Sequence, residues 1–100
     1  MANTEDVVKN NILTYINNNG GIYTDWYVGI AQDPKRRLFV DHGVLEAGDA
    51  WIYDWCLNSD AARNIESYFV TIFKTSGDVG GGDENTTAVY AYKKSSHSRE

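Results

Sequence analysis

Apolar residues near the start of the chain recur at helical spacing, at Val8, Ile12, Tyr15 and Ile16. A stripe of this kind is typical of a helix that buries one face. Thr4 is a suitable N-cap, and the acidic side chains that follow it favour the positive end of the helix dipole. The asparagine and glycine residues at 17–21 tolerate the left-handed conformation of a C-cap, so we expect the helix to end there.

Three later segments have the aromatic and β-branched composition of strands. The first is residues 22–31, with 26–31 its strongest part, and the last is residues 87–93. Between them, residues 51–56 alternate so that Trp51, Tyr53 and Trp55 share one face. Packing in the core is the favoured role of these three rings, and stacking on nucleobases is the alternative if they are exposed.

Two further helices are predicted. Asp33 followed by Pro34 is a strong helix start, because Asp caps the helix and Pro fits its first position. This short helix should run from Pro34 to about Val40. The second helix spans residues 60–74, and its apolar arc consists of Ala61, Ala62, Ile65, Phe69, Ile72 and Phe73.

Glu66 falls inside that apolar arc. A carboxylate on the core side of a helix is unfavourable unless a metal ion, an arginine or a set of donors pairs with it. Glu66 is therefore a candidate functional residue. Two structural alternatives remain: Glu66 reaches solvent at the rim of the arc, or it pairs with Arg63.

These elements predict an α/β fold in which a small antiparallel sheet of about three strands is flanked by helices. We expect residues 1–94 to form a single domain and residues 95–100 to be a flexible tail. No apolar run is long enough to span a bilayer and no signal peptide is recognisable, so a cytoplasmic protein without a membrane partner is expected. The glycine-rich segment 77–85 lacks the Lys-Ser/Thr of a P-loop and is expected to be a flexible connection.

The net charge of −5 argues against a general affinity for nucleic acid. Local exceptions are the cluster Lys35, Arg36 and Arg37 and the pair Lys93 and Lys94. The single Cys56 is expected to be a small, half-buried side chain, because the sequence places no histidine beside it.

The segment Tyr27-Val28-Gly29, with Arg37 ten positions after Tyr27 and Leu38 next, resembles the second half of the GIY-YIG nuclease motif. Glu66 lies where that family has a metal-binding glutamate on a helix. The resemblance spans roughly residues 22–92, and its specific part is residues 27–38.

The resemblance implies a metal-dependent endonuclease, a hydrolase of nucleic-acid phosphodiester bonds. Tyr27 would assist proton transfer, Arg37 would stabilise the scissile phosphate, and Glu66 would bind Mg²⁺ or Mn²⁺. Lys35 and Arg36 would join Arg37 in binding nucleic acid, with DNA favoured over RNA.

Two features differ from the family pattern. Gly21-Ile22-Tyr23 spells the first half of the motif but ends four residues before Tyr27, which leaves no room for a hairpin. That match is either a coincidence or a sign that the first strand is rearranged. His42, a candidate catalytic residue, lies one position later than the family's histidine, and Asn85 is a candidate for its terminal asparagine. These differences and the acidic charge favour an alternative, a catalytically silent module that binds a protein or nucleic acid.

Overall fold

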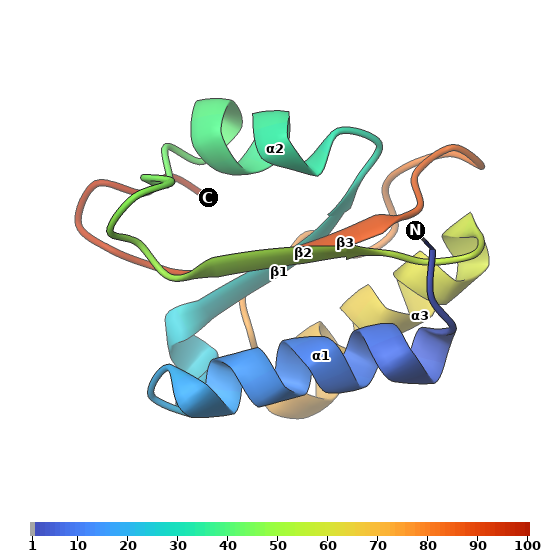
Figure 1. The fold of residues 1–100 in the computed structure, drawn as a ribbon, viewed down its shortest axis with the longest axis horizontal. Coiled ribbons are helices and arrows are strands. Elements are labelled where there is room, and N and C mark those ends of the chain that lie inside the picture. Colours follow the sequence, from blue (N-terminus) through green and yellow to red (C-terminus); the bar gives the residue numbers. More distant parts are fainter. Residues whose placement is uncertain (1) are drawn as a thin grey trace.

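A computed structural model describes residues 2–100, and Figure 1 shows the order of the elements. The helices are α1 (Glu5–Asn18), α2 (Pro34–Arg36) and α3 (Ser59–Tyr68). Both α2 and α3 continue as π-helical segments, Arg37–Asp41 and Phe69–Phe73 respectively. The strands are β1 (Trp26–Ala31), β2 (Trp51–Trp55) and β3 (Ala88–Lys93), and Tyr23–Asp25 forms a 3₁₀ turn before β1.

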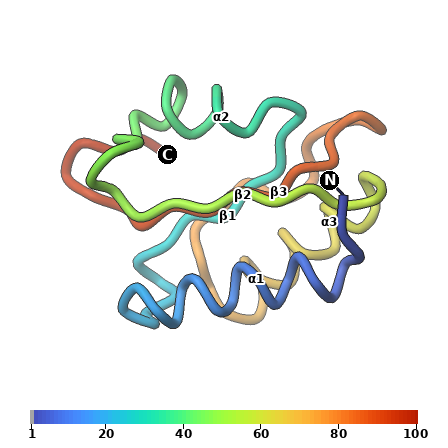
Figure 2. Tube along the Cα trace, viewed as in Figure 1, coloured from blue at the N-terminus to red at the C-terminus, as the bar shows by residue number. Residues whose placement is uncertain are grey.

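The three strands form one antiparallel sheet in the order β1-β3-β2, which the tube in Figure 2 traces. The last strand of the chain is therefore the central one, and β1 and β2 are the edges. Ser76 extends the β1 edge, because its backbone N–H donates to Trp26 and its carbonyl accepts from Val28. The prediction of an α/β fold with a small antiparallel sheet is confirmed.

Polar side chains begin each helix as the sequence predicts. The Thr4 hydroxyl accepts the N–H of Val7, and the Asp33 carboxylate accepts the N–H of Arg36. Asn58 caps α3 through a 2.8 Å bond from the N–H of Ala61. These caps satisfy backbone donors that have no partner within their helix.

The two faces of the sheet carry different side chains. The face that α1 and α3 cover is aliphatic, with Val28, Ala91 and Ile52 in one row. The face under α2 carries an aromatic layer, which we define as Tyr27, Tyr90, Tyr92, Trp51 and Tyr53. At the end of the sheet where β1 leads into α2, this face carries the small residues Gly29, Ala31 and Ala88. Because these residues are small, space is left for a pocket on this face of the sheet.

Residues 95–100, expected to be a flexible tail, hydrogen-bond to the segment after α2. The N–H of Arg99 donates to the carbonyl of His42 at 2.7 Å, and His97 contacts Asp49 at 2.6 Å. Within residues 2–100, no helix combines the length and apolar character needed to cross a bilayer.

Candidate functional site

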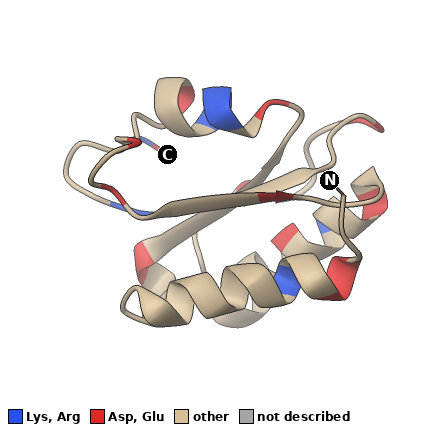
Figure 3. Ribbon diagram, in the orientation of Figure 1, with Lys and Arg blue, Asp and Glu red and all other residues tan. Residues whose placement is uncertain are grey.

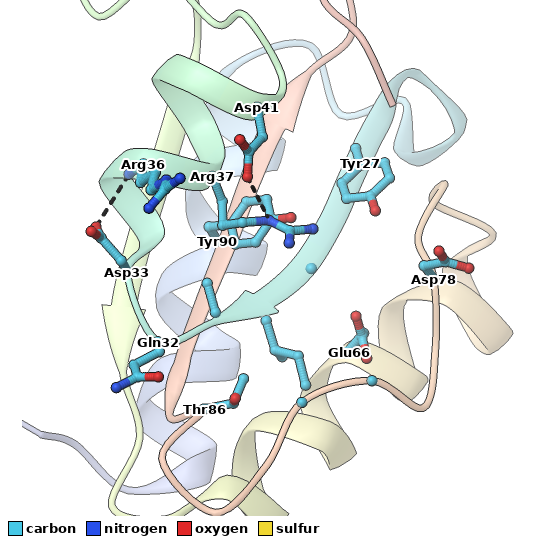
Figure 4. A pocket seen from close by; sticks show the side chains of 15 residues that line it. Tyr27, Gln32, Asp33, Arg36, Arg37, Asp41, Glu66, Asp78, Thr86 and Tyr90 are labelled. Atoms are coloured by element: carbon cyan, nitrogen blue, oxygen red, sulfur yellow. Dashed lines mark hydrogen bonds and ion pairs between the residues drawn. The ribbon is translucent and has the colours of Figure 1, made fainter.

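The space beside β1 is a pocket of about 460 Å³. Its side chains come from β1, β3, α2, α3 and the loop between α3 and β3, and Figure 4 shows them. Tyr27, Arg37 and Glu66, which were predicted from separate parts of the sequence, all line it. The predicted helix-strand pattern accounts for this convergence, because β1 leads directly into α2 and α3 packs on β1.

Glu66 is buried, with 2% of its surface exposed, and its Oε1 atom has no hydrogen-bond partner. Burial raises the pKa of Glu66 to about 7, and Asp78 adds to this effect while the backbone N–H of Gly80 opposes it. Arg63 does not pair with Glu66; its guanidinium contacts Asp60 and the carbonyl of Gly82. Both structural alternatives for Glu66 are therefore excluded. A buried carboxylate oxygen without a donor is a suitable ligand for a cation.

The three cations of α2 have different surroundings. Arg37 is half-exposed, and its Nε lies 3.5 Å from Asp41. Arg36 lines the same pocket, whereas Lys35 lines a second pocket next to it. In Figure 3 the blue positions of α2 have red positions on either side of them along the chain.

Carboxylates outnumber cations in the first pocket. Two arginines line it against Asp33, Asp41, Glu66 and Asp78. A phosphate entering this pocket alone would be repelled, whereas a divalent cation would be attracted. Within residues 2–100, no cluster of three or more metal-binding side chains is present. One or two carboxylates with water suit Mg²⁺, which retains several of its waters in proteins.

The Tyr27 ring lies at the edge of the pocket, and its hydroxyl faces the side on which Glu66 lies (Figure 4). Burial raises the pKa of Tyr27, and the negative charges of Asp78 and Glu66 raise it further, while Arg37 lowers it. Tyr27 is therefore a neutral phenol that can donate or accept a proton among charged groups.

Tyr90 is a site residue that the sequence analysis missed. It is buried in the central strand, and its ring crosses Gly29 of β1, its register partner. A Cβ atom at Gly29 would lie 2.6 Å from Cζ and Oη of Tyr90, so only glycine leaves room for this ring. The available signal was the alternation of Ala88, Tyr90 and Tyr92, which places both tyrosines on one face.

The Tyr90 hydroxyl lies 2.8 Å from Nε2 of His42. On the other side of the imidazole, Nδ1 lies 2.6 Å from the carbonyl oxygen of Arg99. A carbonyl can only accept, so Nδ1 carries the proton, and Nε2 of the neutral ring accepts from Tyr90. Burial lowers the pKa of His42, and Arg37 lowers it further, although the Arg99 carbonyl has the opposite effect.

His42 itself does not line the pocket, and it reaches the pocket through Tyr90. Burial raises the pKa of Tyr90 far above the usual range, while the charge of Arg37 lowers it. Tyr90 thus connects a charged pocket to a buried, neutral histidine that is ready to accept a proton.

Two other motif candidates lie elsewhere. Tyr23 stacks on Phe73 with ring centroids 4.2 Å apart and donates to Asn17, so the first half of the motif contributes nothing to this pocket. Asn85 is exposed, and its N–H donates to Asp83. Cys56 is buried, and burial raises its thiol pKa to about 11, which makes it a poor nucleophile.

No protein-family model, curated protein or solved structure matches this chain. The chemistry of the pocket is therefore argued from its own residues.

Proposed function

We propose that this chain is a divergent GIY-YIG-like domain that hydrolyses nucleic-acid phosphodiester bonds with a divalent cation, Mg²⁺ or Mn²⁺. The observation that carries this proposal is the buried, unpartnered Oε1 of Glu66 in a pocket that Arg37, Tyr27 and Tyr90 also line. β3 pairs with β1 along its full length, which places Tyr27 opposite Tyr92 of the central strand.

In this proposal each side chain has one role. Glu66 would hold the cation, which would supply Lewis-acid stabilisation of negative charge on the phosphate. Arg37 binds the non-bridging oxygens of the scissile phosphate, and its charge acts where the transition state gains charge. Exposure of about half of its side chain leaves it accessible to a substrate.

The two tyrosines and His42 handle the proton. Tyr27 and Tyr90 hold the attacking water by hydrogen bonds to their hydroxyl groups. As the water oxygen bonds to phosphorus, the bond from phosphorus to the leaving oxygen breaks, and the leaving oxygen takes a proton from solvent. The proton of the attacking water passes to Tyr90 Oη, while the proton of Tyr90 passes to Nε2 of His42. The Arg99 carbonyl stabilises the resulting imidazolium through Nδ1–H. Because His42 starts neutral at pH 7, it is available as the acceptor.

A second candidate is the catalytically silent binding module. The pairing of Arg37 with Asp41 favours it, because that contact competes with a phosphate for the guanidinium. In that case the pocket would bind a ligand without cleaving it, and a variant of Glu66 would change binding alone.

The first test is nicking of supercoiled plasmid at low salt with Mg²⁺ or Mn²⁺, together with cleavage of branched DNA and single-stranded RNA. Glu66→Gln should abolish cleavage, by at least about a hundredfold, because the amide loses the charge that binds the cation. Glu46→Gln is the matched control, since Glu46 is exposed and outside the pocket. Absence of cleavage of every substrate by the wild type would contradict the nuclease proposal and favour the silent module.

A further inference from the structure

The second pocket lies directly beside the first and has an aromatic wall. Its volume is about 450 Å³, and its lining residues are Gln32, Asp33, Pro34, Lys35, Tyr53 and Trp55. Gln32 and Asp33 line both pockets, so the two pockets are neighbours at one end of the sheet. The first is lined by Glu66 and Arg37 and the second by residues of the edge strand β2.

Tyr53 and Trp55 are the side chains available for stacking. Both are half-buried on the edge strand, and both face α2. Trp51 is already engaged, because its ring packs edge-on against Phe39 at 5.0 Å and its indole N–H donates to Glu46. Trp51 also stacks on Tyr53 at an interplanar angle of 11°, which holds the Tyr53 ring in place.

Three cations line the two pockets, and they suit a nucleic-acid strand when a divalent cation at Glu66 offsets the carboxylates of the first pocket. Lys35 lies within this second pocket, and Arg36 and Arg37 lie along the first. In the sheet, β2 is two strand spacings from β1, or about 10 Å, so neighbouring nucleotides of one strand can occupy both pockets. Bases in a duplex are stacked on each other, so only an unpaired base can place its face on these rings.

We infer that Tyr53 and Trp55 form a stacking site for an unpaired nucleobase beside the scissile phosphate, so that the substrate class is single-stranded nucleic acid. This inference rests on the proposed function. Lys35 contacts the adjacent phosphate, and the Gln32 amide lies between the two pockets, within reach of a base edge. Because base–aromatic stacking tolerates every base, the site selects for single strands and has little sequence preference.

The test measures binding in the Glu66→Gln background with Mg²⁺ at low salt, so that no cleavage occurs. Fluorescence anisotropy of labelled oligo-dT and of a DNA duplex of equal length reports affinity. Trp55→Leu keeps apolar volume and removes the stacking face, and it should weaken oligo-dT binding about tenfold. Trp55→Phe should restore most of the affinity, and duplex binding should be unchanged in both variants.

Tyr68→Leu is the matched control, because Tyr68 is a half-buried aromatic residue of α3 that lies outside both pockets. Its ring packs against Lys9 of α1. Its oligo-dT affinity should equal that of the parent. The inference is overturned if Trp55→Leu binds oligo-dT as the parent does, if it loses duplex affinity equally, or if the parent binds no oligonucleotide.

The proposed function is tested separately, by plasmid nicking and oligo-dT cleavage with the wild type and with Glu66→Gln, both of which keep Trp55. Cleavage that Glu66→Gln abolishes, together with oligo-dT binding that depends on Trp55, supports both proposals. Oligo-dT binding that depends on Trp55, in a protein that cleaves nothing, keeps the stacking site and removes the nuclease. Nicking by a protein whose oligo-dT binding does not depend on Trp55 keeps the nuclease and removes the stacking site.

Discussion

Buried polar groups at the two ends of the aromatic layer differ in their hydrogen bonding. At the buried end, His42 Nε2 accepts from Tyr90, and His42 Nδ1 and the Tyr92 hydroxyl both donate to the Arg99 carbonyl. At the pocket end, Glu66 Oε1 has no partner at all, although it is equally buried. A satisfied network fixes the positions of its members, whereas an unsatisfied buried group is tolerated where it serves a ligand.

This comparison distinguishes residues that stabilise the structure of the site from residues proposed to act on the substrate. The buried end should respond to substitution with a loss of stability. The pocket end should respond with a loss of activity and little change, or even a gain, in stability.

The largest effect is expected at the pocket end, on activity. Arg37→Gln removes the positive charge expected to contact the phosphate, and it should lower the rate of cleavage about 10²–10³-fold. The free energy of unfolding should change by less than about 0.5 kcal/mol, because the ion pair that Arg37 makes within residues 2–100 is the half-exposed one with Asp41. Plasmid nicking and urea unfolding measure the two quantities.

Lys9→Gln serves as the control for general loss of positive charge, since Lys9 lies on α1 beside Asp6 and lines neither pocket. Its nicking rate should stay within about threefold of the wild type. An equal loss of activity in both variants would mean that overall charge, and not the position of Arg37, controls the reaction.

The next effect lies where the two ends meet, at Gly29. Gly29→Ala should lower the free energy of unfolding by about 2–3 kcal/mol, because the new Cβ would lie 2.6 Å from the Tyr90 ring, which could move only by disturbing its hydrogen bond to His42. Urea denaturation measures this cost. Gly81→Ala is the control, since no atom lies within 4 Å of a Cβ placed there.

A double variant sharpens the same point. Tyr90→Leu removes the ring atoms that meet the new methyl group, so Gly29→Ala should cost much less in that background. Equal costs in both backgrounds would show that Gly29 is required for a reason other than the passage of Tyr90.

The sequence predicted the elements and the fold class because the signals for these are local. The stripe from Val8 to Ile16, the Asp33-Pro34 helix start and the apolar arc around Glu66 each act within one element. Tyr27, Arg37 and Glu66 could be singled out because each lies on such an element at a spacing that could be recognised.

Tyr90 and the partner of His42 could not be predicted in the same way. Tyr90 enters the site because the last strand lies at the centre of the sheet, and strand order leaves no mark on local sequence. Arg99 reaches His42 through its carbonyl oxygen, which every residue possesses, so the polar end of the chain carried no signal of this contact.

The smallest predicted effect is a difference between the two ends in how they make the free energy of unfolding depend on pH. Glu66 has a pKa of about 7 in the folded chain, above its usual 4.5, so the unfolded chain binds fewer protons between these values and stability falls as pH rises. His42 has a lowered pKa in the folded chain, so the stability it contributes is present above its usual pKa of 6.5 and is lost as pH falls below that value. In the wild type, Glu66 and His42 therefore change the free energy of unfolding in opposite directions as the pH rises, and between about pH 5 and 7 the two effects partly cancel.

Glu66→Gln removes one of these two effects. In urea unfolding with EDTA, the variant should be about 1–2 kcal/mol more stable than the wild type at pH 8, where the wild type buries an unpaired charge. The two proteins should differ by less than about 0.5 kcal/mol at pH 4.5, where Glu66 is protonated in the folded chain. The variant should also lose stability as the pH falls below about 6.5, because the contribution of His42 is no longer opposed. A stability difference that does not change with pH would mean that Glu66 is not strained in the folded chain, and the contrast between the two ends would lose its basis.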